Sequence, residues 1–390
     1  MKTKPSVALL FLLSVVLCGC APKKQTKLGD PLPGLTPEQM AQFQAGKEVF
    51  QRVFTPETGL GPLFNAVSCV ECHENPAIGG VGDEIEIHAT RFIPPDTCDP
   101  LFQEGGIVVQ QKATPLLQAK GVQKEQIPPD ATAQAQRTTL PLFGLGLVDA
   151  IPDATILARA KTSGLSHRGI RGHANRAIDG RLGRFGRKAA TATLFDFNAG
   201  AFPGEMGITT PLEPVENTIN GTPIPPDTDP APDPEISLTD ISNVNAFVQF
   251  LAPPPRLILT NLNDKVLAKR GKILFAELKC AACHVPEMRT GANPIKALNC
   301  KTVSLYSDLL VHDLGANLAD ICLNDAHPSD FRTGLLMGLR FRDQFLHDGR
   351  AKTLPAAIEL HGGEAQFSAD KFKALNDYDK KALLKFLETL

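Results

Sequence analysis

Two short cysteine–histidine motifs carry the strongest chemical signal in the sequence. They read Cys-Val-Glu-Cys-His over residues 69–73 and Cys-Ala-Ala-Cys-His over residues 280–284. Two thiols one helical turn apart can add to the two vinyl groups of a porphyrin, and the adjoining histidine can then bind the iron. The motifs therefore predict two covalently bound haem c groups. The predicted haem-binding residues are Cys69, Cys72, His73, Cys280, Cys283 and His284, with the two histidines as iron ligands.

Zinc binding and a thioredoxin-like dithiol are the alternatives for these two motifs. A zinc site would need two further ligands at matched spacing. A redox dithiol would not need a histidine at the same position twice. Haem attachment is therefore the favoured interpretation of both motifs.

Three further cysteines remain outside the haem motifs and the first 20 residues: Cys98, Cys300 and Cys322. An odd number of cysteines in an oxidising compartment predicts one disulfide and one free thiol. Cys300 and Cys322 flank a compact segment, so we expect them to form the disulfide. Cys98 would then be a free cysteine with a structural role.

Residues 1–20 have the features of a bacterial lipoprotein signal peptide. Two lysines precede an apolar run that is too short to span a bilayer, and Leu-Cys-Gly-Cys ending at Cys20 resembles a lipobox. Cys20 is therefore the predicted lipidation site. Ala21 is not the aspartate that typically retains such proteins in the inner membrane, so we expect a periplasmic protein held at the outer membrane by its lipid alone.

The length of 390 residues favours two domains after the signal peptide. Residues 21–35 are polar and proline-rich, which is typical of a tether. We expect an N-terminal haem domain over residues 36–255, including a loop rich in proline and aspartate at 211–234. A C-terminal cytochrome c-like haem domain would cover residues 256–390.

The expected fold is mainly α, with two cytochrome c-like haem domains, long loops and few short strands. Gly-Lys-x-x-Phe stands before each haem motif, at residues 46–50 and 271–275, which indicates two related domains. A helix should begin near Pro37, and residues 383–390 carry apolar side chains at helical spacing. Residues 84–89 are the clearest strand.

The charge balance excludes a polyanionic partner. The chain has 40 Lys and Arg against 42 Asp and Glu, a formal net charge of −2, and no basic cluster. We therefore expect no nucleic-acid binding.

Several longer motifs resemble one known family. In the second half they are Tyr-Ser-Asp-Leu-Leu-Val-His-Asp (306–313), Phe-Arg-Thr-Gly-Leu-Leu-Met-Gly-Leu-Arg (331–340), Phe-Leu-His-Asp-Gly-Arg-Ala (345–351) and His-Gly-Gly-Glu-Ala (361–365). In the first half they are Gly-Leu-Gly-Leu-Val-Asp-Ala-Ile-Pro (144–152), Gly-Arg-Phe-Gly-Arg-Lys-Ala (183–189) and Glu-Met-Gly-Ile-Thr (205–209). With these motifs the chain resembles the di-haem oxidoreductase and peroxidase family, also called thiol-oxidoreductase-like, which is similar to bacterial di-haem cytochrome c peroxidases.

The resemblance implies an acid–base residue at the N-terminal haem. In the similar peroxidases, a glutamate in a Glu-Met-Gly context beside that haem shuttles the proton of peroxide. Glu205 stands in this context. A carboxyl group there can take a proton from one peroxide oxygen and return it to the leaving one. A surface glutamate in a turn is the alternative interpretation.

The resemblance also implies further iron ligands. His88, 15 residues after His73, stands where those peroxidases often have a displaceable histidine, although an ordinary exposed histidine fits its alternating strand equally. His361, 14 residues after His347, stands where they place the sixth ligand of the C-terminal haem. Met337 is the competing candidate for that ligand.

The other histidines and the absence of tryptophan complete the comparison with that family. His312 and His347 are expected to pack or to hold ligands, and His167, His173 and His327 to face water. The chain has no Trp, whereas related enzymes place one between their haems, and Phe185 occupies the corresponding stretch. Phenylalanine is much harder to oxidise, so direct tunnelling between the haems is expected. The calcium site of the relatives uses largely backbone carbonyls, which leave no sequence motif. A bound Ca²⁺ is therefore a further cofactor that the resemblance allows.

The favoured function is therefore that of a periplasmic, lipid-anchored di-haem oxidoreductase of peroxidase type. Electrons from a small redox protein would enter at the C-terminal haem, and peroxide or another oxidisable substrate would react at the N-terminal haem. A di-haem electron carrier is one alternative. An oxidoreductase that acts on thiols or on a partner protein is the other.

Overall fold

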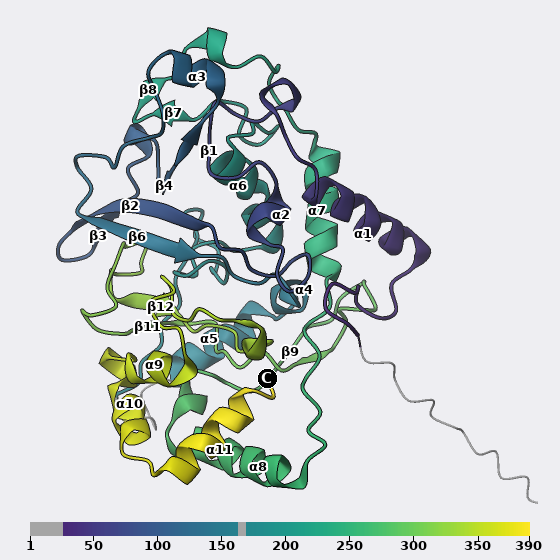
Figure 1. Ribbon diagram of the computed structural model, residues 1–390, viewed down its shortest axis with the longest axis vertical. Coiled ribbons are helices and arrows are strands. Elements are labelled where there is room, and N and C mark those ends of the chain that lie inside the picture. Colours follow the sequence, from purple (N-terminus) through teal and green to yellow (C-terminus); the bar gives the residue numbers. More distant parts are fainter. Residues whose placement is uncertain (1–25, 163–168) are drawn as a thin grey trace, which may run out of the picture.

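The computed structural model describes residues 26–162 and 169–390 (Figure 1). The α-helices are α1 (Pro37–Phe50), α2 (Cys69–Cys72), α3 (Pro115–Ala119), α4 (Leu145–Asp149), α5 (Asp153–Thr162), α6 (Leu194–Met206), α7 (Leu238–Phe250), α8 (Leu262–Glu277), α9 (Leu354–Glu359), α10 (Gln366–Lys373) and α11 (Asp377–Leu387). The strands are β1 (Leu63–Phe64), β2 (Ile85–Ile93), β3 (Thr97–Asp99), β4 (Val108–Val109), β5 (Lys112–Ala113), β6 (Ala133–Thr138), β7 (Thr218–Ile219), β8 (Thr222–Pro223), β9 (Met288–Arg289), β10 (Thr302–Val303), β11 (Val311–Asp313) and β12 (Asp330–Arg332). Helices and loops dominate and most strands are short, so the expectation of a mainly helical fold with few short strands is confirmed.

Helix α1 begins at a reciprocal capping arrangement that the sequence encodes locally. The backbone N–H of Gln39 donates to the side chain of Thr36 at 3.2 Å, and the backbone N–H of Thr36 donates to the side chain of Gln39 at 3.0 Å. Pro37 fills the first helical position, where its missing N–H costs nothing. The predicted helix start near Pro37 is confirmed.

Two pairs of helices cross at unusually close range (Figure 1). Helix α1 packs on α7, and α8 packs on α11 at the opposite end of the molecule. A Cβ at Gly46 of α1 would lie 1.8 Å from the carbonyl oxygen of Asn243, and one at Gly271 of α8 would lie 2.0 Å from that of Ala382. Only glycine allows the two backbones to approach this closely. The repeated Gly-Lys-x-x-Phe sequence therefore marks the two helix crossings.

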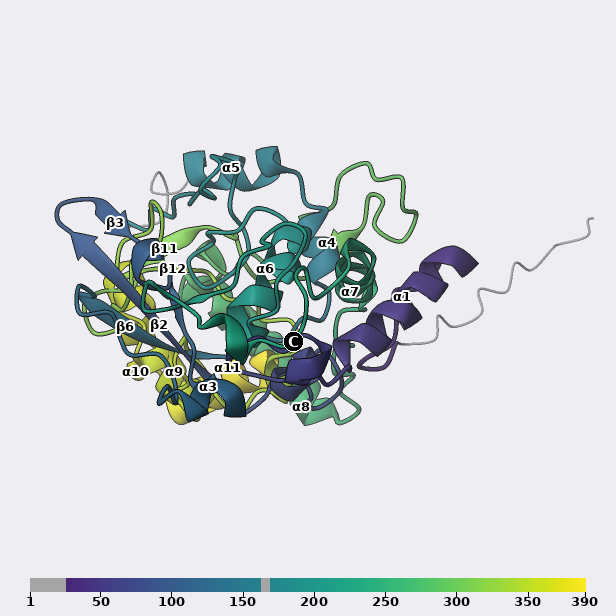
Figure 2. The same ribbon diagram turned by 90° about the horizontal axis from the view of Figure 1, so that it is seen from above.

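One small antiparallel sheet stands apart from the helices. Strand β2 pairs with β3, β4 and β6, and its residues Ile87 and His88 lie opposite Gln136 and Ala135 of β6. Figure 2 shows the sheet on the side of the molecule opposite α1, with α6 and α7 between them. The strand predicted at residues 84–89 is confirmed as the first part of β2.

The buried apolar side chains form two large clusters. The larger cluster contains residues from Leu32 to Met337, and the smaller one residues from Leu267 to Leu390. Side chains such as Leu298 and Leu305 follow the predicted domain boundary at residue 255 yet belong to the larger cluster. The two ends of the molecule therefore share packing, and the boundary itself stays a prediction.

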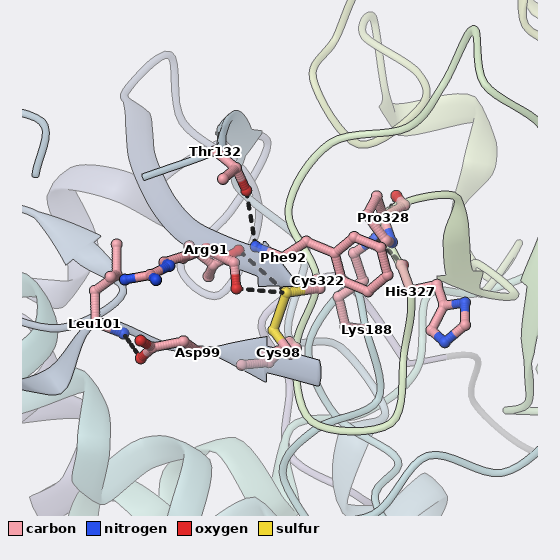
Figure 3. Close-up of a disulfide and its surroundings, with 12 residues drawn as sticks. Arg91, Phe92, Cys98, Asp99, Leu101, Thr132, Lys188, Cys322, His327 and Pro328 are labelled. Carbon is pink, nitrogen blue, oxygen red and sulfur yellow. Dashed lines mark hydrogen bonds between the residues drawn. A yellow bond between two sulfur atoms is a disulfide. The ribbon is translucent and has the colours of Figure 1, made fainter. Parts of the chain in front are cut away.

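The disulfide predicted between Cys300 and Cys322 is wrong. Cys322 is bonded to Cys98 on β3, which lies 224 residues away in sequence (Figure 3). Cys300 is an exposed free thiol that lies between β9 and β10. The disulfide joins two segments that are far apart in the sequence, because folding brings β3 next to the loop before β12. Closeness in sequence, on which the prediction rested, gives no information about such a contact.

The predicted signal peptide and Cys20 lie outside the described residues, as do His167 and the first five residues of the predicted tether. Within residues 26–162 and 169–390, no helix is both long enough and apolar enough to cross a membrane.

Candidate haem sites

The first haem motif lies on the short helix α2 and lines a cavity of about 550 Å³, here called the first cavity. The side chain of Ser68 caps α2 by accepting the N–H of Glu71 at 3.3 Å. His73 follows the helix, and its Nδ1 lies 3.0 Å from the carbonyl oxygen of Gly80. The ring of Phe50 from α1 lies 6.0 Å from the His73 ring. Phe50, from the helix α1, thus packs beside the His73 ring.

The second haem motif repeats this arrangement beside a cavity of about 240 Å³, here called the second cavity. The Nδ1 atom of His284 lies 3.0 Å from the carbonyl oxygen of Tyr306. The ring of Phe275 from α8 lies 6.5 Å from the His284 ring and 5.4 Å from that of Phe386 on α11. Each proximal histidine is therefore supported by the phenylalanine of its own Gly-Lys-x-x-Phe helix.

The donor set of both cavities fits a c-type haem. A carbonyl acceptor at Nδ1 places the ring proton there, which leaves Nε2 of His73 and His284 free for a metal. Burial lowers the pKa of His73, and burial followed by the nearby His361 lowers the pKa of His284 to about 4. Both rings are therefore neutral, as a metal ligand must be. The paired cysteines are free thiols, and burial raises the pKa of Cys69 and of Cys280 to about 12.

Glu205 lies in the wall of the first cavity, at the last turn of α6. Its carbonyl oxygen accepts the N–H groups of Asn65 and Ala66, which fixes the end of α6 beside the segment that leads into the haem motif. Burial, reinforced by the carboxylate of Glu86, raises the pKa of Glu205 well above its usual value. Its Oε2 atom is buried and has no hydrogen-bond partner among the described residues. The side chain is therefore a buried carboxyl group with one oxygen available to a small ligand.

His361 lies in the second cavity together with His284. Its Nδ1 atom lies 2.7 Å from the carbonyl oxygen of Ala357, in the last turn of α9. As in the two proximal histidines, this contact leaves Nε2 free, and burial lowers the pKa of the ring. The second cavity thus holds two histidines prepared for metal binding.

The other candidate iron ligands are placed less favourably. His88 lines the first cavity, but its Nε2 lies 3.0 Å from a carboxylate oxygen of Glu86. Met337 belongs to the larger apolar cluster, where its methyl group lies beside Gly144, and it lines neither cavity. The ligand role of His88 stays a prediction. The structure brings His361, and not Met337, to the second haem motif.

His312 is held too firmly to bind a metal. Its Nδ1 lies 2.8 Å from Glu364 and its Nε2 2.9 Å from Asp308, so both ring nitrogens act as donors. Burial alone would lower its pKa, but hydrogen bonds to Asp308, Cys283 and Glu364 raise the pKa of His312 to about 12. Cys283, Asp308 and His312 could otherwise be taken for a zinc site. The charged ring does not fit that alternative.

Phe185 and the remaining histidines have structural positions. Phe185 lines the first cavity only and packs on Phe197, with ring centres 6.4 Å apart. The side chains of His173 and His327 are 45% and 44% exposed, so the expectation that they face water is confirmed.

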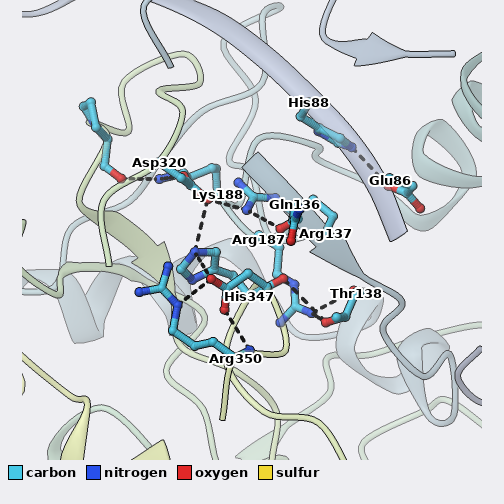
Figure 4. Close-up of polar contacts among 12 residues, drawn as sticks. Glu86, His88, Gln136, Arg137, Thr138, Arg187, Lys188, Asp320, His347 and Arg350 are labelled. Atoms are coloured by element: carbon cyan, nitrogen blue, oxygen red, sulfur yellow. Dashed lines mark hydrogen bonds and ion pairs between the residues drawn. The ribbon is translucent and has the colours of Figure 1, made fainter. Parts of the chain in front are cut away.

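A buried polar cluster between the cavities was missed in the sequence (Figure 4). The carboxylate of Asp320 contacts Arg137, lies 3.1 Å from Lys188 Nζ, and lies 3.5 Å from His347 Nε2. Arg137 and Lys188 line the first cavity, whereas His347 lines the second and stacks on Phe331. The His-Asp-Gly motif at residues 347–349 was the only sequence signal for this cluster.

A cluster of three carboxylates in the long loop lies outside the haem motifs. The carboxylates of Glu216, Asp229 and Asp233 lie within 4.8 Å of one another. Burial, with repulsion from neighbouring carboxylates, raises the pKa of Glu216 to about 9. None of the three lines either cavity. Binding of Ca²⁺ by this protein, which the resemblance allows, stays a prediction.

Three solved structures are remotely similar to this chain. Hydrazine synthase of Kuenenia stuttgartiensis is 14% identical, with all of both chains covered and a TM-score of 0.44. A MauG-like protein associated with microbial copper homeostasis is 17% identical over 95% of this chain and 94% of its own, with a TM-score of 0.40. The diheme peroxidase BthA from Burkholderia thailandensis is 16% identical over 93% and 87%, with a TM-score of 0.42.

Comparison with curated proteins finds no match. Residues 117–390 match the family described as "Di-haem oxidoreductase, putative peroxidase". This match covers most of the chain and includes the second haem motif, Glu205 and His361. The chain therefore belongs to the di-haem oxidoreductase and peroxidase family.

Proposed function

We propose that the protein is a c-type di-haem peroxidase in which peroxide reacts at the first cavity and electrons enter at the second. Cys69, Cys72 and His73 would hold one haem, and the second motif would hold the other. Bound haem iron would supply the redox centre at each site. The physiological oxidant and the electron donor, which we take to be peroxide and a small redox protein, belong to this proposal.

The difference between the distal sides of the two cavities carries the proposal. In the second cavity both His284 and His361 offer a free Nε2, and two nitrogen ligands would leave no room for a substrate. In the first cavity Glu205 offers an unpartnered carboxyl oxygen. A site with an acid–base group suits bond cleavage, and a site closed by two ligands suits electron transfer.

Glu205 would act as the proton carrier of the first cavity. Because burial raises the pKa of Glu205, its carboxylate is a stronger base than an exposed one and can take up a proton and pass it on. One peroxide oxygen would give its proton to the unpartnered Oε2 of Glu205. Oε2 would then return this proton to the departing hydroxide. The buried surroundings exclude bulk water that would compete for this proton.

A periplasmic, lipid-anchored location belongs to the same proposal. Haem attachment through two thioether bonds and the Cys98–Cys322 disulfide both suit an oxidising compartment. Cys20 would carry the lipid at the end of the tether. Globomycin, which blocks lipoprotein signal cleavage, should cause the precursor to accumulate. Detergent partitioning of wild type and Cys20→Ala would show whether the anchor depends on that residue.

The decisive experiment compares Glu205→Gln with wild type in peroxide turnover. Glutamine keeps the shape of the side chain but cannot shuttle a proton, so turnover should fall about 10²–10⁴-fold while both haems remain. Glu216→Gln is the matched control, because Glu216 is also a carboxyl with a raised pKa but lines neither cavity. Equal peroxide reactivity of Glu205→Gln in rapid-mixing spectra would remove the catalytic role.

Low-temperature EPR of the isolated protein separates this proposal from the electron carrier. The peroxidase proposal expects one high-spin haem, open to substrate, and one low-spin haem. Two low-spin haems would support the carrier instead.

A further inference from the structure

A single wall separates the two cavities, and positively charged side chains stand in it. The residues that line both cavities are Thr138, Thr139, Leu140, Arg187, Arg332, Leu335 and Arg342. Three of the seven are arginines, and no acidic residue is among them. The wall between the two proposed haems is therefore a basic one.

The three arginines of this wall bind only neutral acceptors. Arg187 donates to the carbonyl and hydroxyl oxygens of Thr138, at 2.8 and 2.9 Å (Figure 4). Arg332 donates through Nε to the carbonyl oxygen of Gly186 at 2.8 Å and also to that of Thr333. Arg342 donates to the carbonyl oxygen of Leu335 at 3.1 Å.

No carboxylate of the described residues lies within ion-pair distance of the three guanidinium groups, and the charges of Glu86 and Asp308 act on Arg187 and Arg332 only from farther away. Within the described residues none of them forms an ion pair, and the buried Nε atoms of Arg187 and Arg342 have no hydrogen-bond partner. Burial, and for the first two also repulsion from neighbouring arginines, lowers the pKa of Arg187 to about 9 and those of Arg332 and Arg342 to about 10. They remain cationic at neutral pH.

Other arginines near the first cavity differ in this respect. Arg137 contacts the carboxylate of Asp320, and Arg184 contacts that of Asp153. Arg137 and Arg184 line the first cavity alone, and a carboxylate of the protein neutralises each of them. Several kcal/mol oppose each buried charge that has no partner. The three exceptions are the ones that face both cavities, which points to an anion supplied from the cavities.

We propose that Arg187, Arg332 and Arg342 form an anion site whose ligands are the propionate carboxylates of both haems. This proposal rests on the proposed function, because it requires a haem in each cavity. A haem carries two propionates, and a guanidinium group binds a carboxylate through two parallel hydrogen bonds. The wall would then anchor both haems and place the same positive charge beside each of them.

The test measures the reduction potentials of both haems in the complete haem-loaded protein. Arg187→Gln, Arg332→Gln and Arg342→Gln are compared with wild type by optical redox titration. Removing positive charge favours the oxidised state, so both potentials should move to lower values in each variant. Arg342→Lys keeps the charge but not the paired donors, and its shift should be smaller.

Two controls separate charge in the wall from general damage. Arg340→Gln removes an arginine that lines neither cavity and binds backbone carbonyls of Pro255 and Leu390, so both potentials should stay unchanged. A titration of wild type in phosphate and in chloride at equal ionic strength distinguishes propionates from a free anion. Potentials that are independent of phosphate support propionate ligands.

The outcomes are distinguishable from failure of the proposed function. Wild type without two covalent haems would refute the proposed function itself. With both haems present, an unmoved potential for either haem in the Gln variants, or wild-type potentials that follow the phosphate concentration, would overturn the anion site. If the Gln variants do not fold, oxidised-minus-reduced infrared spectra of wild type with ¹³C-labelled propionates replace them. Ionised carboxylate bands support the site, and protonated ones overturn it.

Discussion

The two ends of the molecule use one scaffold for two different sites. At each end a helix with Gly-Lys-x-x-Phe crosses a second helix, and its phenylalanine lies between the proximal histidine and a phenylalanine of the crossing helix. Phe50 lies 5.0 Å from Phe247, and Phe275 lies 5.4 Å from Phe386. The parts that would hold the two proposed haems through His73 and His284 are thus the same. We call residues 36–255 the first module and residues 256–390 the second.

The modules differ on the opposite side of each cavity. The first module presents Glu205 from the end of a long helix, and the second presents His361 from the end of a short one. Neither residue belongs to the repeated helix pair. Under the proposed function, the helix crossing would fix where a haem is bound, and the segments that carry Glu205 and His361 would decide what that haem can do.

Removal of one pair of attachment cysteines should have the largest effect. Cys69→Ala with Cys72→Ala should leave one covalent haem, and so should the same pair of changes at Cys280 and Cys283, because each haem has its own thiols. Intact mass and haem staining measure this. Two haems remaining in either double variant would show that the motifs are not equivalent attachment sites.

His361→Ala should alter the second module only. Loss of the Nε2 ligand should convert one low-spin EPR signal to high-spin. His361→Met should raise the potential of one haem and leave the other nearly unmoved, because thioether ligation favours reduced iron. If the His361→Ala variant keeps the wild-type EPR spectrum, His361 is not an iron ligand. The proposed difference between the two modules would then be lost.

Removal of the Cys98–Cys322 disulfide should weaken the connection between the modules. Cys98→Ala with Cys322→Ala should lower the free energy of unfolding by about 2–5 kcal/mol. Cys300→Ala is the control, and because Cys300 is exposed and unpaired it should change little. Thermal unfolding measures both. A loss of the same size in Cys300→Ala would restore the pairing that the sequence suggested.

Alanine at either crossing glycine should destabilise its own module to a similar degree. Gly46→Ala and Gly271→Ala each force a helix to move away from a backbone carbonyl, which costs about 1–3 kcal/mol. Gln44→Ala, at an exposed position of the same helix as Gly46, should stay within about 0.5 kcal/mol of wild type. Denaturant unfolding gives the values. A large cost at only one glycine would break the equivalence of the two crossings.

The smallest predicted effect concerns pH. Within the described residues, every carboxyl group whose pKa is clearly raised belongs to the first module, including Glu216, at about 9, and Glu235, at about 7, both chiefly through burial. A raised carboxyl pKa gives stability that is complete below the unfolded value near 4.5 and is lost as the pH rises through the folded value.

Thermal unfolding at pH 5 and pH 9 tests this sign. The melting temperature of the first module should fall toward pH 9, and Glu216→Gln should reduce the fall. Because Glu216 keeps partial access to solvent, we expect a change of only a few degrees, given about 2–4 °C per kcal/mol for domains of 150–250 residues. A greater fall in the second module would contradict the assignment.

The sequence predicts those parts of this molecule that are encoded locally. Residues 69–73 and 280–284 predict the haem sites because the chemistry requires adjacent residues, and Thr36, Pro37 and Gln39 indicate a helix start within one turn. His361 was found because its distance from His347 matched a known family. In each case a short stretch of chain contains the whole signal.

The remaining features depend on contacts between distant segments. Cys98 meets Cys322 only after the sheet has formed, and Arg187 meets Arg332 and Arg342 only after both modules have packed. No periodicity or spacing connects such residues, since tertiary packing alone brings them together. The sequence therefore predicts the two attachment motifs but not the wall of arginines between the cavities.

The helix crossings also set a difference in chain entropy between the modules. Helices α1 and α7 are about 190 residues apart along the chain, whereas α8 and α11 are about 100 apart. The entropy lost on closing a loop grows with the logarithm of its length, so closure of the first crossing costs about 0.6 kcal/mol more. The longer loop also contains the whole first haem motif and the β2 sheet. We therefore expect the C-terminal helix pair to form before the N-terminal one during folding, even though it is synthesised last.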